Sequence, residues 1–101
     1  MRRFAHCRVD ANHLATANHL RKVGFSVVSL APMGGGIPDL LVGRPNFSCL
    51  VELKDGQKPA SKQKLTPKEQ EFSDSWTGPL ITAYSAEDAA TKLLALWRGW
   101  A

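Results

Sequence analysis

The stretch GIPDLLVGRPNFSCLVELK, residues 36–54, decides how this chain of 101 residues folds. It holds two runs rich in apolar and β-branched residues, 39–43 and 47–54, which are typical of strands. The turn formers Arg44-Pro45-Asn46 separate them, so the two strands are expected to pair as an antiparallel hairpin.

The spacing across this turn also predicts which side chains meet. A turn centred near Pro45 and Asn46 places Asp39 opposite Glu52, and opposed residues have Cβ atoms about 4.5–5.5 Å apart. Because side chains alternate along a strand, Glu52 and Lys54 share the face of Asp39. The other face is expected to enter the core and carries Leu40, Val42, Phe47, Cys49, Val51 and Leu53.

The segments around the hairpin predict an α/β domain. We expect helices over residues 11–23, from Pro67 to about Trp76, and from Ser85 onward, with further strands over residues 25–31 and 80–84. Thr66 and Glu69 form a capping box around Pro67 at the start of the second of these helices. The order is α-β-β-β-α-β-α with a mixed sheet, in one domain spanning residues 1–101.

The outer helices should bury one face each. In the first helix, which Asp10 or Asn12 would cap, the buried face is expected to carry Leu14, Ala17 and Leu20. In the last helix it is expected to carry Leu93, Leu94 and Trp97.

Composition and charge limit the classes of function. The chain has 44% hydrophobic and 22% charged residues, no apolar run near the ~18 residues of a membrane span, and no apolar segment after Arg2 and Arg3 that would make a signal peptide. We therefore expect a cytoplasmic protein with no membrane partner, in which Cys7 and Cys49 are reduced thiols.

The net charge of +4 favours a polyanionic partner. The residues before Met33 account for all of it, and a second basic stretch, residues 58–68, contains no acidic residue. Candidate phosphate contacts are Arg21, Lys22, Lys58, Lys62 and Lys64, although a solvated basic surface would have the same composition.

Two opposed carboxylates beside an ammonium group predict a cation site. Asp39 and Glu52 are the kind of ligands that Mg²⁺ takes, and such an ion activates water and stabilises charge on a phosphodiester. Lys54 on the same face could orient the attacking water. The glycines at 34–36 are expected to leave open backbone that a phosphate chain can approach.

These residues resemble a known nuclease family. Pro38-Asp39 followed by Glu52-Leu53-Lys54 is similar to the PD-(D/E)XK motif, and the order of GIPDLLVG, LVELK and Leu65-Thr66-Pro67 with Gln70 resembles its VRR-NUC branch. The resemblance covers about residues 10–94. It implies a restriction-endonuclease-like α-β-β-β-α-β core with a C-terminal helix, and cleavage of DNA phosphodiesters with Mg²⁺ or Mn²⁺.

The resemblance also implies roles for single residues. Asp39 and Glu52 would be metal ligands together with the backbone carbonyl of Leu53, Lys54 would be the catalytic lysine, and Gln70 would face the site from its helix. Small stand-alone members act on branched DNA as homodimers, like Holliday-junction resolvases, so a homodimer acting on branched or flap DNA is the expectation.

This chain departs from the family in its first helix. Related nucleases often carry an acidic metal ligand there, whereas Asp10, at or before the helix cap, is the only acidic residue upstream of Asp39. Asp10 is either a helix cap, the more common role, or an unusually placed ligand. The departure supports an alternative, a catalytically inactive DNA-binding module that keeps the fold; a protein-interaction subunit docking through the last helix is the third possibility.

Overall fold

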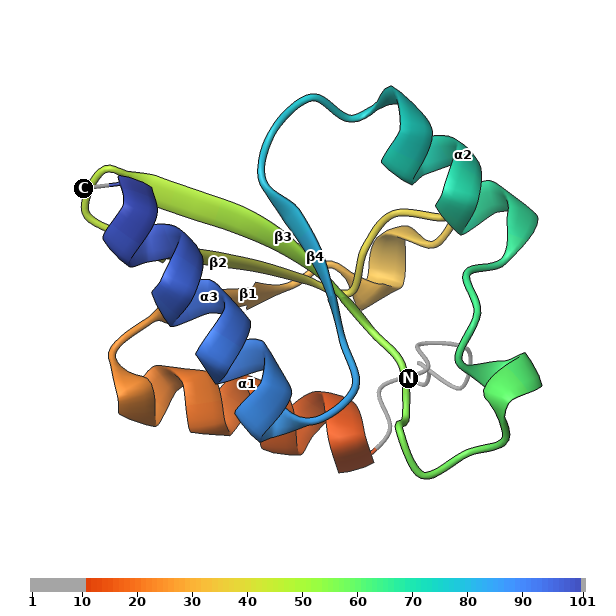
Figure 1. Ribbon diagram of the computed structural model, residues 1–101, viewed down its shortest axis with the longest axis horizontal. Helices are drawn as coiled ribbons and strands as arrows, with labels where there is room; N and C mark the ends of the chain where they lie inside the picture. Colours follow the sequence, from red (N-terminus) through yellow and green to blue (C-terminus); the bar gives the residue numbers. More distant parts are fainter. Residues whose placement is uncertain (1–10, 101) are drawn as a thin grey trace, which may run out of the picture.

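The expected hairpin lies at the centre of the sheet in the computed structural model, which describes residues 11–100 (Figure 1). It consists of β2 (Leu40–Arg44) and β3 (Phe47–Leu53). β1 (Ser26–Ser29) pairs antiparallel with β2, and β4 (Leu80–Ala83) pairs parallel with β3, so the described residues form a mixed four-stranded sheet of order β1-β2-β3-β4.

The predicted hairpin register is confirmed. Leu41 lies opposite Leu50 and Gly43 lies opposite Ser48, as expected from a turn centred on Pro45 and Asn46. Asn46 has a positive φ of 63°, a conformation that asparagine tolerates in tight turns.

Three helices flank this sheet in the described part of the chain: α1 (Ala11–Val23), α2 (Pro67–Ser75) and α3 (Ala86–Trp100). α1 and α3 pack against each other, and Figure 1 shows α2 standing apart from both. Short 3₁₀ turns, η1 (Ala31–Met33) and η2 (Ala60–Lys62), lie in the connections. The element order α-β-β-β-α-β-α and the C-terminal helix are as predicted. Within residues 11–100, no helix is long and apolar enough to cross a membrane.

The core lies between one face of the sheet and the helices α1 and α3. The predicted inward face of the hairpin is confirmed, with Leu40, Val42, Phe47, Cys49 and Val51 buried and Leu53 packed against them. Burial raises the pKa of the Cys49 thiol to about 11, which keeps this group protonated. The helices contribute Ala17, Leu20, Ala89, Ala90 and Leu93. The predicted buried side of α3 is thus confirmed, since Leu94 and Trp97 also pack against this cluster.

The predicted inward face of α1 is partly wrong. Leu14 is 55% exposed, while His13 and Thr16 are buried with Ala17 and Leu20. These four positions follow the i, i+3, i+4, i+7 spacing of one helix face, so the helix turns two polar residues inward and leaves a leucine outside.

The first strand is shorter than the expected span of residues 25–31. It ends at Ser29, and the amide of Met33 then donates to the carbonyl of Leu30 at 2.9 Å to form η1. Pro32 explains this difference, because it has no N–H to donate to a strand partner. The predicted capping box of α2 is confirmed: Thr66 accepts from the Glu69 amide and Glu69 from the Thr66 amide.

Arg44, at the end of β2, joins the sheet to both core helices. Its guanidinium lies 4.2 Å from the ring centroid of Phe25 and 4.4 Å from that of Trp97. It also donates a 2.6 Å hydrogen bond to the carbonyl of Val23, the last residue of α1. A planar, weakly hydrated cation suits this position between two rings, and it satisfies one of the free carbonyls at the helix end.

We predict that Arg44→Lys lowers the free energy of unfolding by about 1–2 kcal/mol, because lysine keeps the charge but cannot stack between two rings. Urea unfolding followed by circular dichroism measures this loss. Arg98→Lys, at an exposed position of α3, is the matched control and should change stability by less than about 0.5 kcal/mol. Equal urea midpoints for Arg44→Lys and the control would contradict the role given to Arg44.

Candidate active site

The candidate site lies at the end of the β2–β3 hairpin opposite its turn. Asp39 directly precedes β2, after the buried Pro38, and its Oδ2 accepts a 2.7 Å hydrogen bond from the backbone amide of Leu53. Extending the observed pairing by one residue sets Asp39 opposite Glu52. The backbone of the hairpin therefore fixes one carboxylate beside the other.

Glu52 is a buried carboxyl group with like-charged neighbours. It is only 6% exposed, although it is a charged residue type next to the end of β3. Burial, and then the charge and hydrogen bond of Asp39, raise the pKa of Glu52 to about 9; Glu69 adds to the effect and Lys54 opposes it. A group in this position costs the folded protein stability whenever it is ionised without a compensating cation.

Lys54 is the nearby cation, and α2 holds it. Its Nζ lies 2.7 Å from Oε1 of Glu69 and 4.0 Å from Oε2 of Glu52. The same Glu69 oxygen accepts the Thr66 amide at 2.8 Å, so the capping box of α2 also positions the lysine. Burial raises the pKa of Glu69, but the hydrogen bonds from Lys54 and Thr66 outweigh it and hold that pKa below its ordinary value.

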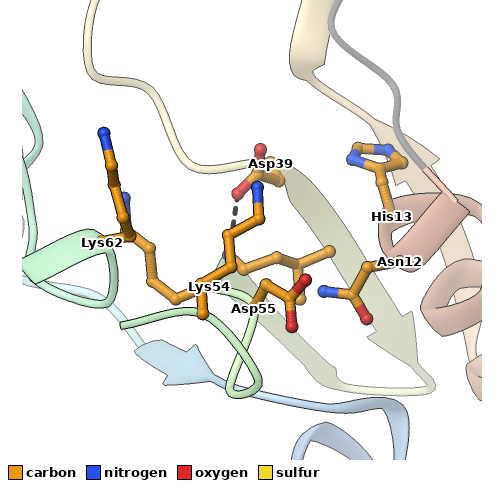
Figure 2. Close-up of a pocket in the computed structure, with 8 residues that line it drawn as sticks. Asn12, His13, Asp39, Lys54, Asp55 and Lys62 are labelled. Carbon is orange, nitrogen blue, oxygen red and sulfur yellow. Dashed lines mark hydrogen bonds between the residues drawn. The ribbon is translucent and has the colours of Figure 1, made fainter. Parts of the chain in front are cut away.

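A cavity of about 200 Å³ opens beside Asp39 and Lys54 (Figure 2), whereas Glu52 and Glu69 line a separate, smaller hollow. Asp39, Leu53 and Lys54 line one part of it, and Figure 2 shows the Lys54 side chain extending toward Asp39. The remaining lining comes from the start of α1 and from the loop after β3, through Asn12, His13, Asp55, Lys58 and Lys62.

The first helix therefore reaches the site, but with side chains that carry no carboxylate. Asn12 and His13 lie in the cavity wall, and neither supplies a carboxylate there. His13 is 5% exposed, and its Nε2 lies 3.1 Å from the hydroxyl of Ser29, which joins α1 to the end of β1.

Gln70 does not occupy the position expected for it. Its side chain is exposed and donates to Asp74 at 2.8 Å, one turn further along α2. Glu69, one residue earlier, makes the contact with Lys54 instead. The sequence identified Glu69 only as a helix cap, and nothing in the pattern indicated that it also contacts the lysine.

The candidate DNA contacts fall into three places. Lys58 and Lys62 line the cavity, and Lys64 lines a separate groove. Arg21 and Lys22 are exposed at the far end of α1, about 13 Å along the helix from Asn12. Arg21 is engaged locally, with the Asn18 side chain and the Val27 carbonyl. Asp10 lies outside the described residues.

The glycine loop is open only in part. Extra Cβ atoms on Gly34 and Gly35 would meet nothing within 4 Å, as expected for backbone that a phosphate could approach. At Gly36 a Cβ would lie 2.6 Å from the backbone oxygen of Lys68, so the expectation of open backbone is wrong there. Gly36 instead lets the loop pack on the first turn of α2, with a φ of 86° that favours glycine.

The donors present fit a divalent cation with few protein ligands. Among residues 11–100 no group of three or more His, Cys, Asp or Glu side chains is arranged to hold a metal. The pair of Asp39 and buried Glu52 is nevertheless a donor set that Mg²⁺ accepts, since this ion commonly uses one or two carboxylates and keeps several waters. A cation would also oppose the rise in the pKa of Glu52, which burial causes first and the charge of Asp39 second.

Comparisons of the chain with protein-family models, with characterised proteins and with solved structures found no match.

We predict that Glu52→Gln raises the thermal stability of the metal-free protein at pH 8. The folded state holds the Glu52 proton up to about pH 9 and the unfolded chain only to about 4.5. The stabilisation that the folded state gains from holding this proton is therefore complete below about pH 4.5, and it is lost as the pH rises toward 9. Glutamine mimics the protonated form, so this loss disappears.

The measurement is thermal unfolding in EDTA between pH 4 and 9. A gain of about 1 kcal/mol corresponds to about 4–8 °C for a domain of this size. Glu87→Gln, at an exposed position of α3, is the control and should show no such pH-dependent gain. A Glu52→Gln protein less stable than wild type at pH 8 would contradict the account of the buried carboxyl group.

Proposed function

We propose that this protein is a metal-dependent DNA endonuclease with a restriction-endonuclease-like core, of the PD-(D/E)XK type and its VRR-NUC branch. One observation carries the proposal: the hairpin sets a buried Glu52 beside Asp39 with the ammonium of Lys54 4.0 Å from Glu52. Ionising both of these carboxyl groups is costly without a cation, and a bound cation that acts on a phosphodiester would offset that cost.

The topology supports the same proposal. The described chain has the order α-β-β-β-α-β, with β4 parallel to β3, before its last helix. This is the element order that the resemblance implies. It brings the end of the hairpin, the start of α1 and the first turn of α2 to one place.

The chain's own residues divide the chemistry among them. Asp39 and Glu52 would hold Mg²⁺ or Mn²⁺, with the Leu53 carbonyl as a further oxygen donor, and the ion when bound supplies an acidic water and positive charge at the phosphate. Lys54, held by Glu69, donates hydrogen bonds to the attacking water or to a phosphate oxygen. Lys58 and Lys62 bind the DNA backbone beside the cavity.

The active form is proposed to be a homodimer acting on branched or flap DNA in the cytoplasm of a bacterium, or of a host cell if a phage encodes it. Sedimentation of the purified protein checks the oligomeric state.

We predict that Lys54→Ala slows Mg²⁺-dependent cleavage at least about 100-fold, the usual cost of removing one donor that stabilises a transition state. Asp39→Asn should have a similar effect, while its side-chain oxygen still accepts the Leu53 amide. Labelled four-way-junction, flap and linear duplex DNA are incubated with Mg²⁺, Mn²⁺ or EDTA. Arg98→Ala, far from the cavity lining, is the control and should cut like wild type. Full activity in purified Lys54→Ala would refute the assignment.

The second candidate is a catalytically inactive DNA-binding module with this fold. Asn12 and His13 in the cavity wall favour it, because they supply no third acidic ligand. Such a module binds DNA with an affinity that falls steeply with salt, and its binding is independent of Mg²⁺. Salt-sensitive binding without cleavage under any metal ion would select this candidate over the nuclease.

A further inference from the structure

A second hollow, a groove of about 610 Å³, lies between the β3–α2 connection, α2 and β4. Gln63, Lys64, Leu65, Gln70 and Tyr84 are among the residues that line it. We propose that this groove binds an unpaired nucleotide of a DNA strand, with its base stacked on Tyr84. The choice of DNA as the ligand rests on the proposed function; the binding site itself is additional to the cavity at Lys54.

Tyr84 is an exposed aromatic residue on a rigid backbone. It is 37% exposed, yet its amide donates to Asp88 at 3.0 Å and its carbonyl accepts the amide of Gly56 at 3.0 Å. A Cβ at Gly56 would lie 2.9 Å from that carbonyl, so this glycine permits the close contact. With the backbone held at both its amide and its carbonyl, only the two side-chain torsions of Tyr84 have to be ordered when a ligand stacks on the ring.

One side of the ring is already occupied. The ammonium of Lys92 lies 5.1 Å from the ring centroid, and it is held by the Thr82 carbonyl at 2.7 Å and by Asp88 at 2.9 Å. A planar base can therefore stack only on the side that Lys92 leaves open. Stacking of this kind accepts any base, because each base presents a π face.

The polar lining suits a nucleotide as well. None of the groove-lining residues is acidic, and Lys64 supplies a positive charge for a phosphate. Gln70 uses its amide nitrogen on Asp74, and its carbonyl oxygen remains available to accept a hydrogen bond from a base edge. Gln63 fixes the wall by donating to the carbonyls of Gly56 and Lys58.

The groove adjoins the proposed site of cleavage. The Lys54 amide donates to the Ala83 carbonyl, and the Gly56 amide donates to the Tyr84 carbonyl. The segments that follow β3 and β4 therefore continue side by side beyond the sheet. Extending the β3–β4 register by one residue sets Lys54 beside Tyr84, at the ~4.8 Å spacing of neighbouring β-strands. η2 (Ala60–Lys62) lies between the hollows, with Lys62 at the cavity and Ala60 at the groove.

A paired base cannot stack on a protein ring without leaving its duplex, whereas a base in a single-stranded arm can. The groove therefore predicts tighter binding to forked DNA than to blunt duplex, and a dependence of that difference on the ring of Tyr84.

The test compares wild-type protein with Tyr84→Phe and Tyr84→Leu. Fluorescence anisotropy in EDTA measures binding to a forked DNA and to the blunt duplex of the same paired sequence. Tyr84→Leu keeps an apolar side chain but should weaken fork binding about fivefold or more, with no change for blunt duplex. Tyr84→Phe keeps the ring and should stay within about twofold of wild type. Trp76→Leu is the control, an aromatic residue 43% exposed outside the groove lining.

2-Aminopurine in the single-stranded arm gives an independent reading, since its fluorescence is quenched when the base stacks. Quenching by wild type and Tyr84→Phe but not by Tyr84→Leu supports the inference. Equal fork binding by Tyr84→Leu and wild type, or equal losses on fork and blunt duplex, would overturn it. These binding measurements need no cleavage. If the protein cuts no DNA but prefers forked DNA in a Tyr84-dependent way, the nucleotide-binding groove is supported and the nuclease function is rejected.

Discussion

The carboxyl groups of Asp39 and Glu52, set against each other at the open end of one hairpin, are the constraint on which the rest of the site depends. The register of β2 and β3 fixes them, and the Leu53 amide fixes the orientation of Asp39. Glu52 is buried on a central strand whose backbone is paired on both sides. The fold therefore places two carboxyl groups together where ionising both is expensive, and the surrounding groups offset this cost only in part.

The helix α2 is the main part of that offset. Its capping box places the Glu69 carboxylate next to Lys54, so the same carboxylate caps the helix and holds the Lys54 ammonium near Glu52. Gly36 lets the preceding loop pack on the first turn of this helix. The stability of α2 and the position of Lys54 are therefore coupled. The lysine-rich connection between β3 and α2 has one side toward the cavity and the other toward the Tyr84 groove.

The sequence predicted the hairpin, its register and the pairing of Asp39 with Glu52, because strand alternation and turn residues are local properties. The capping box was predictable for the same reason. Leu14 was misplaced because the buried face of α1 includes His13 and Thr16, which hydropathy assigns outside. The contact of Glu69 with Lys54, and the places of Asn12 and His13 in the cavity wall, depend on how helices pack on the sheet. No spacing along the chain encodes that packing.

Binding of a divalent cation tests the central claim most directly, since the account gives the carboxylate pair this purpose. Titration of Mn²⁺ into wild-type protein, followed by the electron paramagnetic resonance signal of the free ion, measures it without DNA. The account predicts a saturable site that Mg²⁺ displaces and that is lost in Asp39→Asn. Equal binding by wild type and Asp39→Asn, or no binding by either, would contradict the assignment of Asp39 and Glu52 as metal ligands.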